Sequence, residues 1–189
     1  VYNTVKSAIE PVIESRGHMI LIASVYATAN GVINTSYAAS KAGVEALGRS
    51  LRAELEPHGA SAGVAYFGFV ETDLIGEIFD NELADAFRTE IAPAVLTGKM
   101  PVSQVADALI EGFRNRAPRI IEPPAWRPPI YMRGQVGPIS DRQLERNPKA
   151  GDFIRQFEAR DIGPSAAPVH EPVKSGDTYG LAGKTVLVT

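Results

Sequence analysis

Apolar and polar positions along the first 122 residues fall into blocks that predict helices and buried strands in alternation. In some blocks apolar residues recur every three or four positions, as on a helix with one buried face, and in others they form short runs typical of buried strands. The predicted elements are a helix over 2–15, a strand over 19–24, a helix over 37–56, a strand over 63–67, a helix opened by Pro101 and an edge strand over 119–122. Strand, helix and strand in this order imply a parallel sheet and an α/β fold.

The alternation fades after residue 122. Residues 73–98 read as an irregular or helical excursion, and the stretch after 122 is first rich in Pro, Gly and Arg and then carries a charged helical segment at 140–160. We therefore divide the chain into a sheet-forming unit at 1–122, a partly helical C-terminal extension at 123–162, a linker at 163–179 and a further strand at 180–189.

Composition narrows the expected partners and location. The 189 residues include 19 basic and 22 acidic side chains, a net charge of −3 that does not favour nucleic-acid binding. The chain has no cysteine, which excludes disulfides, cysteine nucleophiles and thiolate metal sites. It shows no apolar leader and no apolar run near twenty residues, so we expect a cytoplasmic protein without a membrane span, acting on a small molecule.

Three polar side chains predict a proton-transfer site. Ser24 closes the apolar run at 19–24, Tyr37 begins the next helix, and Lys41 follows one helical turn later on the same face. A phenol with a pKa near 10 needs a nearby cation to act as an acid or base at neutral pH, and Lys41 is placed to supply it. Ser24 would hydrogen-bond a substrate oxygen. This chemistry suits oxidation of alcohols or reduction of carbonyls.

Simpler explanations remain open for each of these residues. Tyr37 and Lys41 would also suit an ordinary helix-surface pair, and Ser24 would suit a capping serine. The apolar stripe of the helix at 37–56 is either core or a face for a partner helix; it comprises Val44, Leu47, Leu51 and Leu55. The histidines show no metal-ligand spacing, and no metal is expected; they are His18, His58 and His170.

Together these motifs resemble the catalytic half of a short-chain dehydrogenase/reductase. Ser24, Tyr37-Ala-Ala-Ser-Lys41 and Gly68-Phe-Val-Glu-Thr72 follow one another in the family's order, between Val1 and about Glu122. The resemblance implies a Rossmann-like doubly wound parallel sheet, incomplete in this chain, and NAD or NADP as cofactor. It also implies that the corresponding helices pack together in a homo-oligomer.

The resemblance assigns cofactor contacts to five positions. Tyr37 and Lys41 would contact the cofactor, with Lys41 holding the nicotinamide ribose hydroxyls. A segment after the strand at 63–67 would contact the carboxamide end; its matching residues are Gly68, Val70 and Thr72. Gly68 also has a simpler explanation as the end of a strand, and Thr72 as a helix cap. The family usually has Pro before this Gly, where the present chain has Phe67.

The order of the motifs is unusual for such a unit. No Gly-rich phosphate turn precedes Ser24, whereas residues 180–189 resemble the first strand of the same family. The chain then reads as a junction within a tandem protein, as a partial sequence or as a rearranged chain completed by a partner, and we favour the tandem protein.

The expected function is an NAD(P)-dependent interconversion of an alcohol and a carbonyl, with Tyr37 as general acid/base. Apolar residues within 73–98 predict a lipophilic substrate. The alternative is a catalytically silent fragment or assembly module that lacks the cofactor phosphate site.

Overall fold

The computed structural model describes residues 1–72, 90 and 97–159 and is built around a three-stranded parallel sheet. The strands lie in the order β1 (His18–Ile22), β2 (Ser61–Phe67) and β5 (Arg119–Glu122), so that β2 is central and β5 lies at an edge, as predicted. Six of the seven residues of β2 are buried, which explains its almost continuous apolar sequence. The predicted parallel α/β sheet is confirmed.

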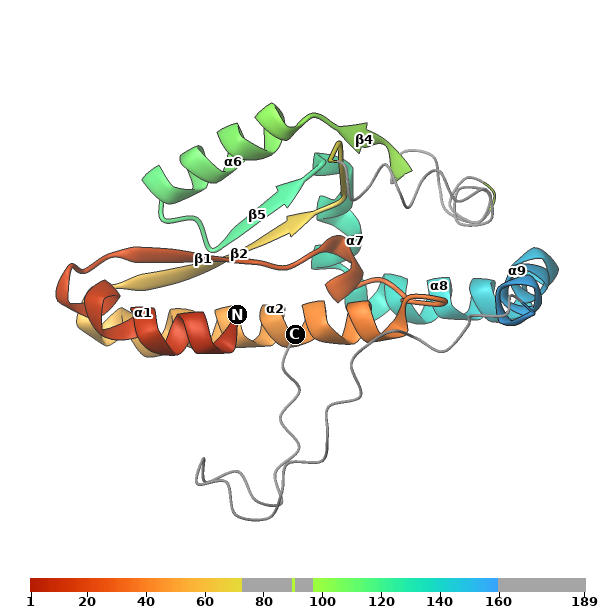
Figure 1. The fold of residues 1–189 in the computed structure, drawn as a ribbon, viewed down its shortest axis with the longest axis horizontal. Helices are drawn as coiled ribbons and strands as arrows, with labels where there is room; N and C mark the ends of the chain where they lie inside the picture. The colour runs from red at the N-terminus through yellow and green to blue at the C-terminus, as the bar shows by residue number, and fades with distance from the viewer. Residues whose placement is uncertain (73–89, 91–96, 160–189) are drawn as a thin grey trace, which may run out of the picture.

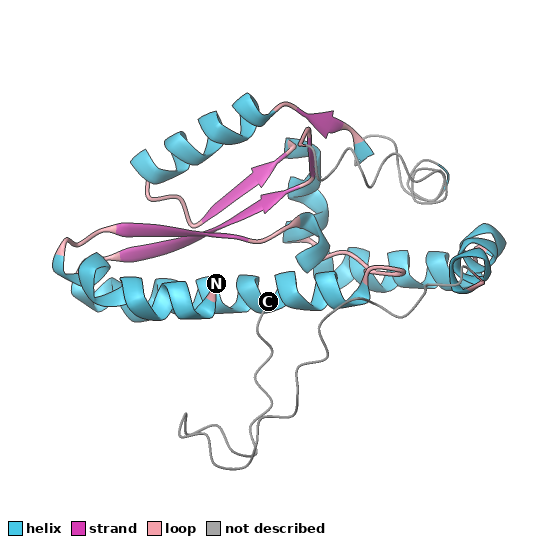
Figure 2. Ribbon diagram, viewed as in Figure 1, coloured by secondary structure: helices cyan, strands magenta, loops and turns pink. Residues whose placement is uncertain are grey.

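Helices cover both faces of this sheet (Figures 1 and 2). Helices α1 (Tyr2–Glu14) and α2 (Thr35–Leu55) lie on one face and α6 (Val102–Arg114) lies on the other. Side chains alternate along β2, so Val64 and Tyr66 join the core with α1 and α2, while Ala65 and Phe67 join the core with α6. The sheet is therefore covered on both faces, as in a Rossmann-like fold.

The apolar stripe of α2 packs against the sheet. Val44, Leu51 and Leu55 are at most 5% exposed, and Leu47 packs partly buried against the same core. The stripe is thus core, and its alternative interpretation as a face for a partner helix is wrong. Gly48 permits the close approach, because a Cβ there would lie 2.5 Å from Cγ2 of Val64.

Two of the element boundaries that differ from the prediction lie near the predicted site. The strand predicted to reach residue 24 ends at Ile22, because Ser24 caps the short helix η1 (Val25–Ala27) and accepts a hydrogen bond from the backbone N–H of Tyr26. Helix α2 begins at Thr35, two residues before the predicted start. Tyr37 and Lys41 therefore lie in the first two turns of α2, as predicted, whereas Ser24 lies just after β1, on the connection between β1 and α2.

Helices α1 and α6 end in the same backbone motif. Arg16 and Arg116 both have φ of 48°, and the backbone bonds Gly17 to Val12 and Ala117 to Gly112 close a Schellman turn at each end. The guanidinium of Arg116 donates to the carbonyls of Arg16, Gly17 and Gly59. Gly59 follows the short helix η2 (Glu56–His58), so this arginine links the turns that precede all three strands.

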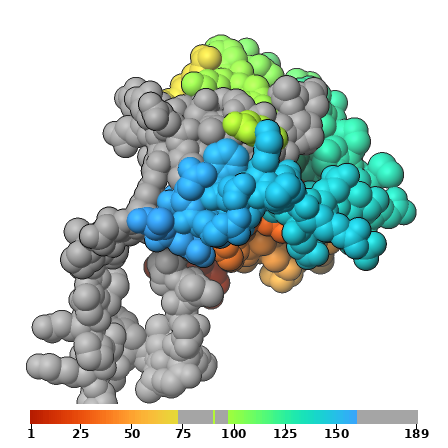
Figure 3. Space-filling model, turned by 90° about the vertical axis from the view of Figure 1, so that its right-hand side faces the viewer, coloured from red at the N-terminus to blue at the C-terminus, as the bar shows by residue number. Residues whose placement is uncertain are grey.

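The residues after β5 are more helical than the sequence indicates. They form η3 (Pro124–Trp126), α7 (Arg127–Tyr131), α8 (Arg133–Arg146) and α9 (Pro148–Glu158). The helix predicted within 140–160 is present as parts of α8 and α9, and the Pro- and Gly-rich stretch before it, for which no helix was specified, is also helical. Helices α8 and α9 form the surface at one end of the molecule, above α2 in Figure 3.

A second, smaller sheet lies beyond the carboxyl end of β2. Strands β3 (Phe69–Val70) and β4 (Lys99–Met100) pair in parallel. Most of the predicted excursion at 73–98 and all of 163–189 lie outside the described residues, so the linker and the further strand stay predictions. Of the helices that the structure describes, none combines the length and apolarity needed to cross a membrane.

Candidate active site

Ser24 lies at the carboxyl end of β1 and has two structural partners. Its side chain is buried, 5% exposed, and its Oγ donates to the carbonyl of Phe67 at 3.3 Å while accepting from the N–H of Tyr26 at 3.2 Å. The bond to Phe67 joins Ser24 directly to the segment that begins at Gly68. Because the hydroxyl hydrogen is used in this bond, Ser24 must turn away from Phe67 before it can donate to another oxygen.

Tyr37 lies in the first turn of α2, and its ring is held by a neighbouring aromatic residue. The ring is 39% exposed and meets the ring of Tyr26 edge to face, with centroids 5.8 Å apart. The contact fixes the plane of Tyr37 while leaving part of the side chain accessible, as a proton-transferring phenol requires.

Lys41 lies one turn beyond Tyr37 on the same face of α2. Its Nζ is 5.6 Å from the centroid of the Tyr37 ring and donates to the carbonyl of Ile22 at 3.2 Å. Burial lowers the pKa of Lys41. The ammonium thus lies over the tyrosine ring and bonds to the last residue of β1, so it connects the helix to the strand that leads to Ser24.

Tyr26 is a residue of this site that the sequence interpretation missed. Its ring also meets Phe69 edge to face, with centroids 6.5 Å apart, so it lies against both Tyr37 and the segment after β2. Burial, together with the nearby Tyr37, raises the pKa of Tyr26, which keeps its phenol neutral. The sequence places Tyr26 two residues after Ser24, but an aromatic residue at such a position is typical of a hydrophobic core and does not indicate a site.

The predicted carboxamide-binding segment lies beside Ser24. The N–H of Gly68 donates to the carbonyl of Glu122 at 2.8 Å, and Val70 belongs to β3 and packs in the core beneath α6. A Cβ at Gly68 would lie 3.0 Å from Cδ of Pro123, so packing alone accounts for glycine at this position. Thr72 is exposed at the end of the described segment. The structure therefore brings Gly68 near Ser24, because Gly68 follows the residue that Ser24 contacts, whereas Val70 packs in the core with α6. The cofactor contacts of Gly68, Val70 and Thr72 stay predictions.

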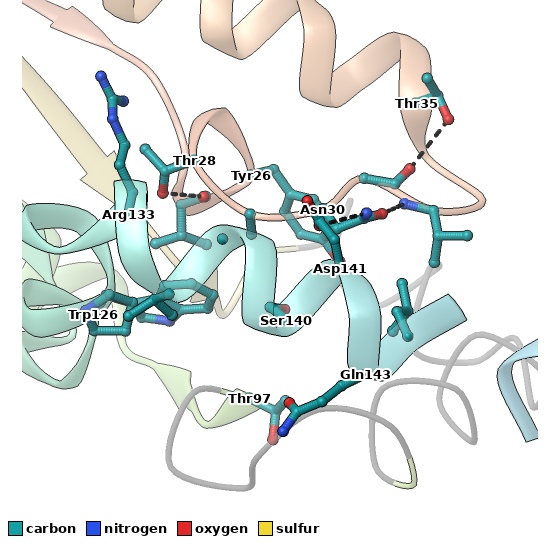
Figure 4. A pocket seen from close by; sticks show the side chains of 18 of the residues that line it. Tyr26, Thr28, Asn30, Thr35, Thr97, Trp126, Arg133, Ser140, Asp141 and Gln143 are labelled. Atoms are coloured by element: carbon teal, nitrogen blue, oxygen red, sulfur yellow. Dashed lines mark hydrogen bonds between the residues drawn. The ribbon is translucent and has the colours of Figure 1, made fainter. Parts of the chain in front are cut away.

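A cavity of about 960 Å³ opens beside Tyr26 (Figure 4). One wall comes from the loop between β1 and α2, including Tyr26, Asn30 and Thr35, and the other comes from the C-terminal extension, including Trp126 and Asp141. The sequence analysis looked for the substrate lining in residues 73–98, most of which lie outside the described residues. The contribution of α8 was missed because its sequence carries no chemical motif.

Two polar contacts hold the C-terminal extension against this site. Arg133 of α8 donates from Nη1 to both carboxylate oxygens of Glu45 on α2, at 2.6 and 2.7 Å. The Glu45 side chain is only 7% exposed. Nearer the cavity, Nδ2 of Asn30 donates to Oδ1 of Asp141 at 2.9 Å. These contacts join the predicted catalytic helix and the loop before it to α8.

The described residues contain no group of three or more His, Cys, Asp or Glu side chains that could hold a metal ion. His18 lies at the start of β1, and His58 lies in η2, just before β2. Both are therefore at the end of the sheet opposite Ser24. His170 is outside the described residues.

Comparison with known proteins found relatives for the first part of the chain. Residues 1–83 match the family model of short chain dehydrogenases. Over 82 residues the chain is 39% identical to "Dehydrogenase OXI1" of Cochliobolus heterostrophus, an alignment that covers 43% of this chain and 35% of that protein. It is 35% identical over 86 residues to the 3-oxoacyl-(acyl-carrier-protein) reductase FabG of Chlamydia pneumoniae, covering 45% of this chain and 35% of the reductase.

A solved structure shares the fold. The structure of a 4-hydroxyisoleucine dehydrogenase complexed with NADH superposes with a TM-score of 0.54 at 16% identity, covering 64% of this chain and 51% of that one. The chain spans about a third of the length of the curated relatives above. The family match over residues 1–83 includes Ser24, Tyr37 and Lys41. Residues 1–83 are therefore similar to the short chain dehydrogenases.

Proposed function

We propose that the protein containing this chain is an NAD(P)-dependent oxidoreductase that interconverts an alcohol and a carbonyl, with Tyr37 as its general acid/base. The observation that carries the proposal is the convergence of Tyr37 and Lys41 on one face of α2, beside Ser24, at the carboxyl end of a parallel sheet. Ligands of open α/β sheets bind at this end of the strands.

The donors at this end fit the proposed cofactor. The Lys41 ammonium has three N–H donors and the Tyr37 phenol has one, which suits a ribose that offers hydroxyl oxygens. Gly68, Val70 and Thr72 would lie along the carboxamide end. When bound, the nicotinamide supplies or accepts the hydride.

The chain's own residues would handle the proton. In the reductive direction the Tyr37 hydroxyl gives its proton to the substrate oxygen, and in the oxidative direction the phenolate takes it back. Lys41 would place its positive charge beside the Tyr37 ring during this transfer. Ser24 would hold the substrate oxygen by a hydrogen bond once its hydroxyl leaves the carbonyl of Phe67, and Tyr26 would keep the Tyr37 ring in place.

The apolar part of the cavity supports a lipophilic substrate. Val25, Phe69 and Trp126 supply apolar surface from three different elements around it. We also retain a cytoplasmic location and a homo-oligomer within the proposal. The cytoplasmic location rests on a composition without cysteine. The homo-oligomer rests on the resemblance to the family, because the apolar stripe of α2 is part of the core.

Replacement of Tyr37 by Phe in the intact protein tests the proposal. The change removes the proton donor but keeps the ring contact with Tyr26, so turnover should fall by about 10²–10⁴-fold while cofactor affinity stays within a few-fold. Steady-state kinetics and a fluorescence titration with NADH and NADPH measure the two effects.

The matched control is Tyr2→Phe, which removes the hydroxyl of a tyrosine that is 64% exposed on α1. It should leave turnover unchanged. Activity near the wild-type level in Tyr37→Phe would overturn the proposed role, and failure of the unmodified protein to bind either cofactor would favour a catalytically silent module.

A further inference from the structure

We propose that the cavity beside Tyr26 binds the end of the substrate remote from the reacting carbon, and that Asp141, held by Asn30, selects an uncharged end that donates hydrogen bonds. The inference rests on the proposed function and adds the substrate class. It concerns residues of the loop at 28–35 and of α8, none of which belongs to the motifs that indicated the family.

The position of Tyr26 connects the cavity to the reacting groups. The same ring that meets Tyr37 at 5.8 Å also lines the cavity. A molecule whose hydroxyl or carbonyl lies at Tyr37 can therefore extend past Tyr26 into the space between the loop and α8. The cavity, at about 960 Å³, has the size of sites that enclose small organic ligands.

The two charged residues among the described lining residues are not equivalent. Arg133 has its charge compensated, because Nη1 contacts both oxygens of the nearly buried Glu45. Asp141 receives its hydrogen bond from the neutral amide of Asn30, which leaves the carboxylate charge in place. The described part of the lining therefore carries one uncompensated negative charge, at Asp141, and an anionic group there would be repelled.

Two hydroxyls on the loop side of the cavity are arranged as acceptors. The hydroxyls of Thr28 and Thr35 donate to the carbonyls of Val25 and Gly31, at 3.1 and 3.3 Å, so their hydrogens are used and their oxygen lone pairs remain. Figure 4 shows these bonds on the loop side of the cavity and Asp141, on α8, beside Asn30. The lone pairs of these two hydroxyls can therefore accept from a bound group that brings its own hydrogens.

Asn30 is fixed in the orientation that serves Asp141. Its Oδ1 accepts from the N–H of Val32 at 3.0 Å, and this leaves Nδ2 as the atom that donates to Asp141 at 2.9 Å. Both ends of the amide are thus occupied, and the carboxylate is held at the cavity wall. Together with the apolar walls, the site fits a neutral, largely apolar molecule with a hydroxyl group at its far end.

Three probes that share one reacting group test this inference. The compounds 2-decanol, 1,9-decanediol and 9-hydroxydecanoate all carry the same CH₃–CH(OH) end, and they differ in a terminal methyl, hydroxyl or carboxylate. We expect the intact protein to bind the diol about tenfold more tightly than the carboxylate, measured by NMR titration without cofactor.

The variant Asp141→Asn removes the charge and keeps an acceptor for Asn30, so the diol-to-carboxylate ratio should fall to about threefold or less through tighter binding of the carboxylate. Asp152→Asn is the matched control, because Asp152 is exposed on α9 and pairs with Arg155. It should keep the wild-type ratio. Thermal unfolding checks the fold of each variant, and Asp141→Ser provides a second substitution that removes the charge.

Three outcomes would overturn the inference: an unchanged ratio in folded Asp141→Asn and Asp141→Ser, equal wild-type affinity for diol and carboxylate, or no binding of any probe. The proposed function fails separately. A protein that discriminates between the probes but oxidises no alcohol would refute the oxidoreductase, whereas Tyr37-dependent oxidation without discrimination would refute only the role of Asp141.

Discussion

Single side chains near the carboxyl end of β1 combine structural and proposed chemical roles. Ser24 ends the strand, caps η1 and bonds to Phe67, so the sequence alternatives of a capping serine and a site serine are compatible. The sequence located Ser24, Tyr37 and Lys41 because they lie in a local motif. It did not indicate Tyr26 or Asp141, whose neighbours come from distant parts of the chain.

His18 shows the same dependence on distant neighbours at the other end of β1. Its Nδ1 is 2.8 Å from Oγ of Ser61, its ring meets Phe113 edge to face, and its Nε2 is buried without a hydrogen-bond partner among the described residues. Burial, then the positive charges of Arg52 and Arg116, lower the pKa of His18. The folded protein therefore favours the neutral ring.

This lowered pKa predicts loss of stability in mild acid. The unfolded chain takes up a proton at His18 near pH 6.5 more readily than the folded chain does, so the contribution is complete above that pH and is lost as the pH falls below it. The loss should stay below about 1.4 kcal/mol per pH unit, the limit for one proton. Urea unfolding at pH 7.5 and 5.5 measures it.

The variant His18→Gln should show a smaller difference between the two pH values than the unmodified protein. His58→Gln serves as the control because His58 is exposed in η2, and it should retain the full difference. A His18→Gln variant with the same acid sensitivity as the unmodified protein would show that His18 is not responsible.

The helices and strands with a clear periodic pattern of apolar residues were predicted from the sequence. Those whose formation depends on contacts with distant parts of the chain were not. Helices α1, α2 and α6 and strands β1, β2 and β5 all lie where the apolar spacing indicated, within two residues at most boundaries. The first half of α8 was missed because Pro138 and two glycines argue against a helix. Gly137 reduces the cost of that proline, since the residue before a proline clashes through its Cβ and glycine has none.

Gly48 tests how closely α2 must approach the sheet. In Gly48→Ala the new Cβ would lie 2.5 Å from Cγ2 of Val64 and 3.6 Å from Leu21, so the free energy of unfolding should fall by about 1–3 kcal/mol. Chemical denaturation measures the change.

The same helix offers a matched control in Gly43, where a Cβ would have no heavy atom within 4 Å. Gly43→Ala should raise the free energy of unfolding by up to about 1 kcal/mol, because alanine favours a helix over glycine. Equal effects of the two substitutions would contradict the close packing of α2 on β2.

At the scale of the whole molecule, the C-terminal extension is joined to the sheet unit by contacts that no local pattern reveals. Glu45 and Arg133 are 88 positions apart, and each reads in the sequence as an ordinary surface charge on a helix. Their pairing depends on how α7 directs the chain after β5, which is a property of the assembled fold. The parallel sheet was predictable, but the wall that α8 adds to the cavity was not.

Arg133→Met tests this connection. It would leave the Glu45 carboxylate nearly buried with only Arg49, whose Nη1 is 3.7 Å away, as a remaining partner in an ion pair among the described residues. The free energy of unfolding should fall by about 2 kcal/mol, less than the ~3–5 kcal/mol of a fully buried pair because Arg133 is partly exposed. Adding Glu45→Gln should recover part of the loss.

The control is Arg155→Met, which breaks an exposed pair with Asp152 on α9 and should change stability by no more than about 0.5 kcal/mol. Strictly additive effects of the Arg133 and Glu45 substitutions would contradict the pairing.

Arg116, just after α6, connects the three turns that precede the strands of the main sheet. Because the Arg116 guanidinium holds carbonyls from the turn before β1 and the turn before β2, and itself lies in the turn before β5, none of the three turns can open without releasing the others. Amide hydrogens at the starts of these strands should therefore exchange with solvent as one cooperative unit. Local opening at this end of the sheet then involves all three turns together. It takes place far from the side chains proposed to carry out the chemistry.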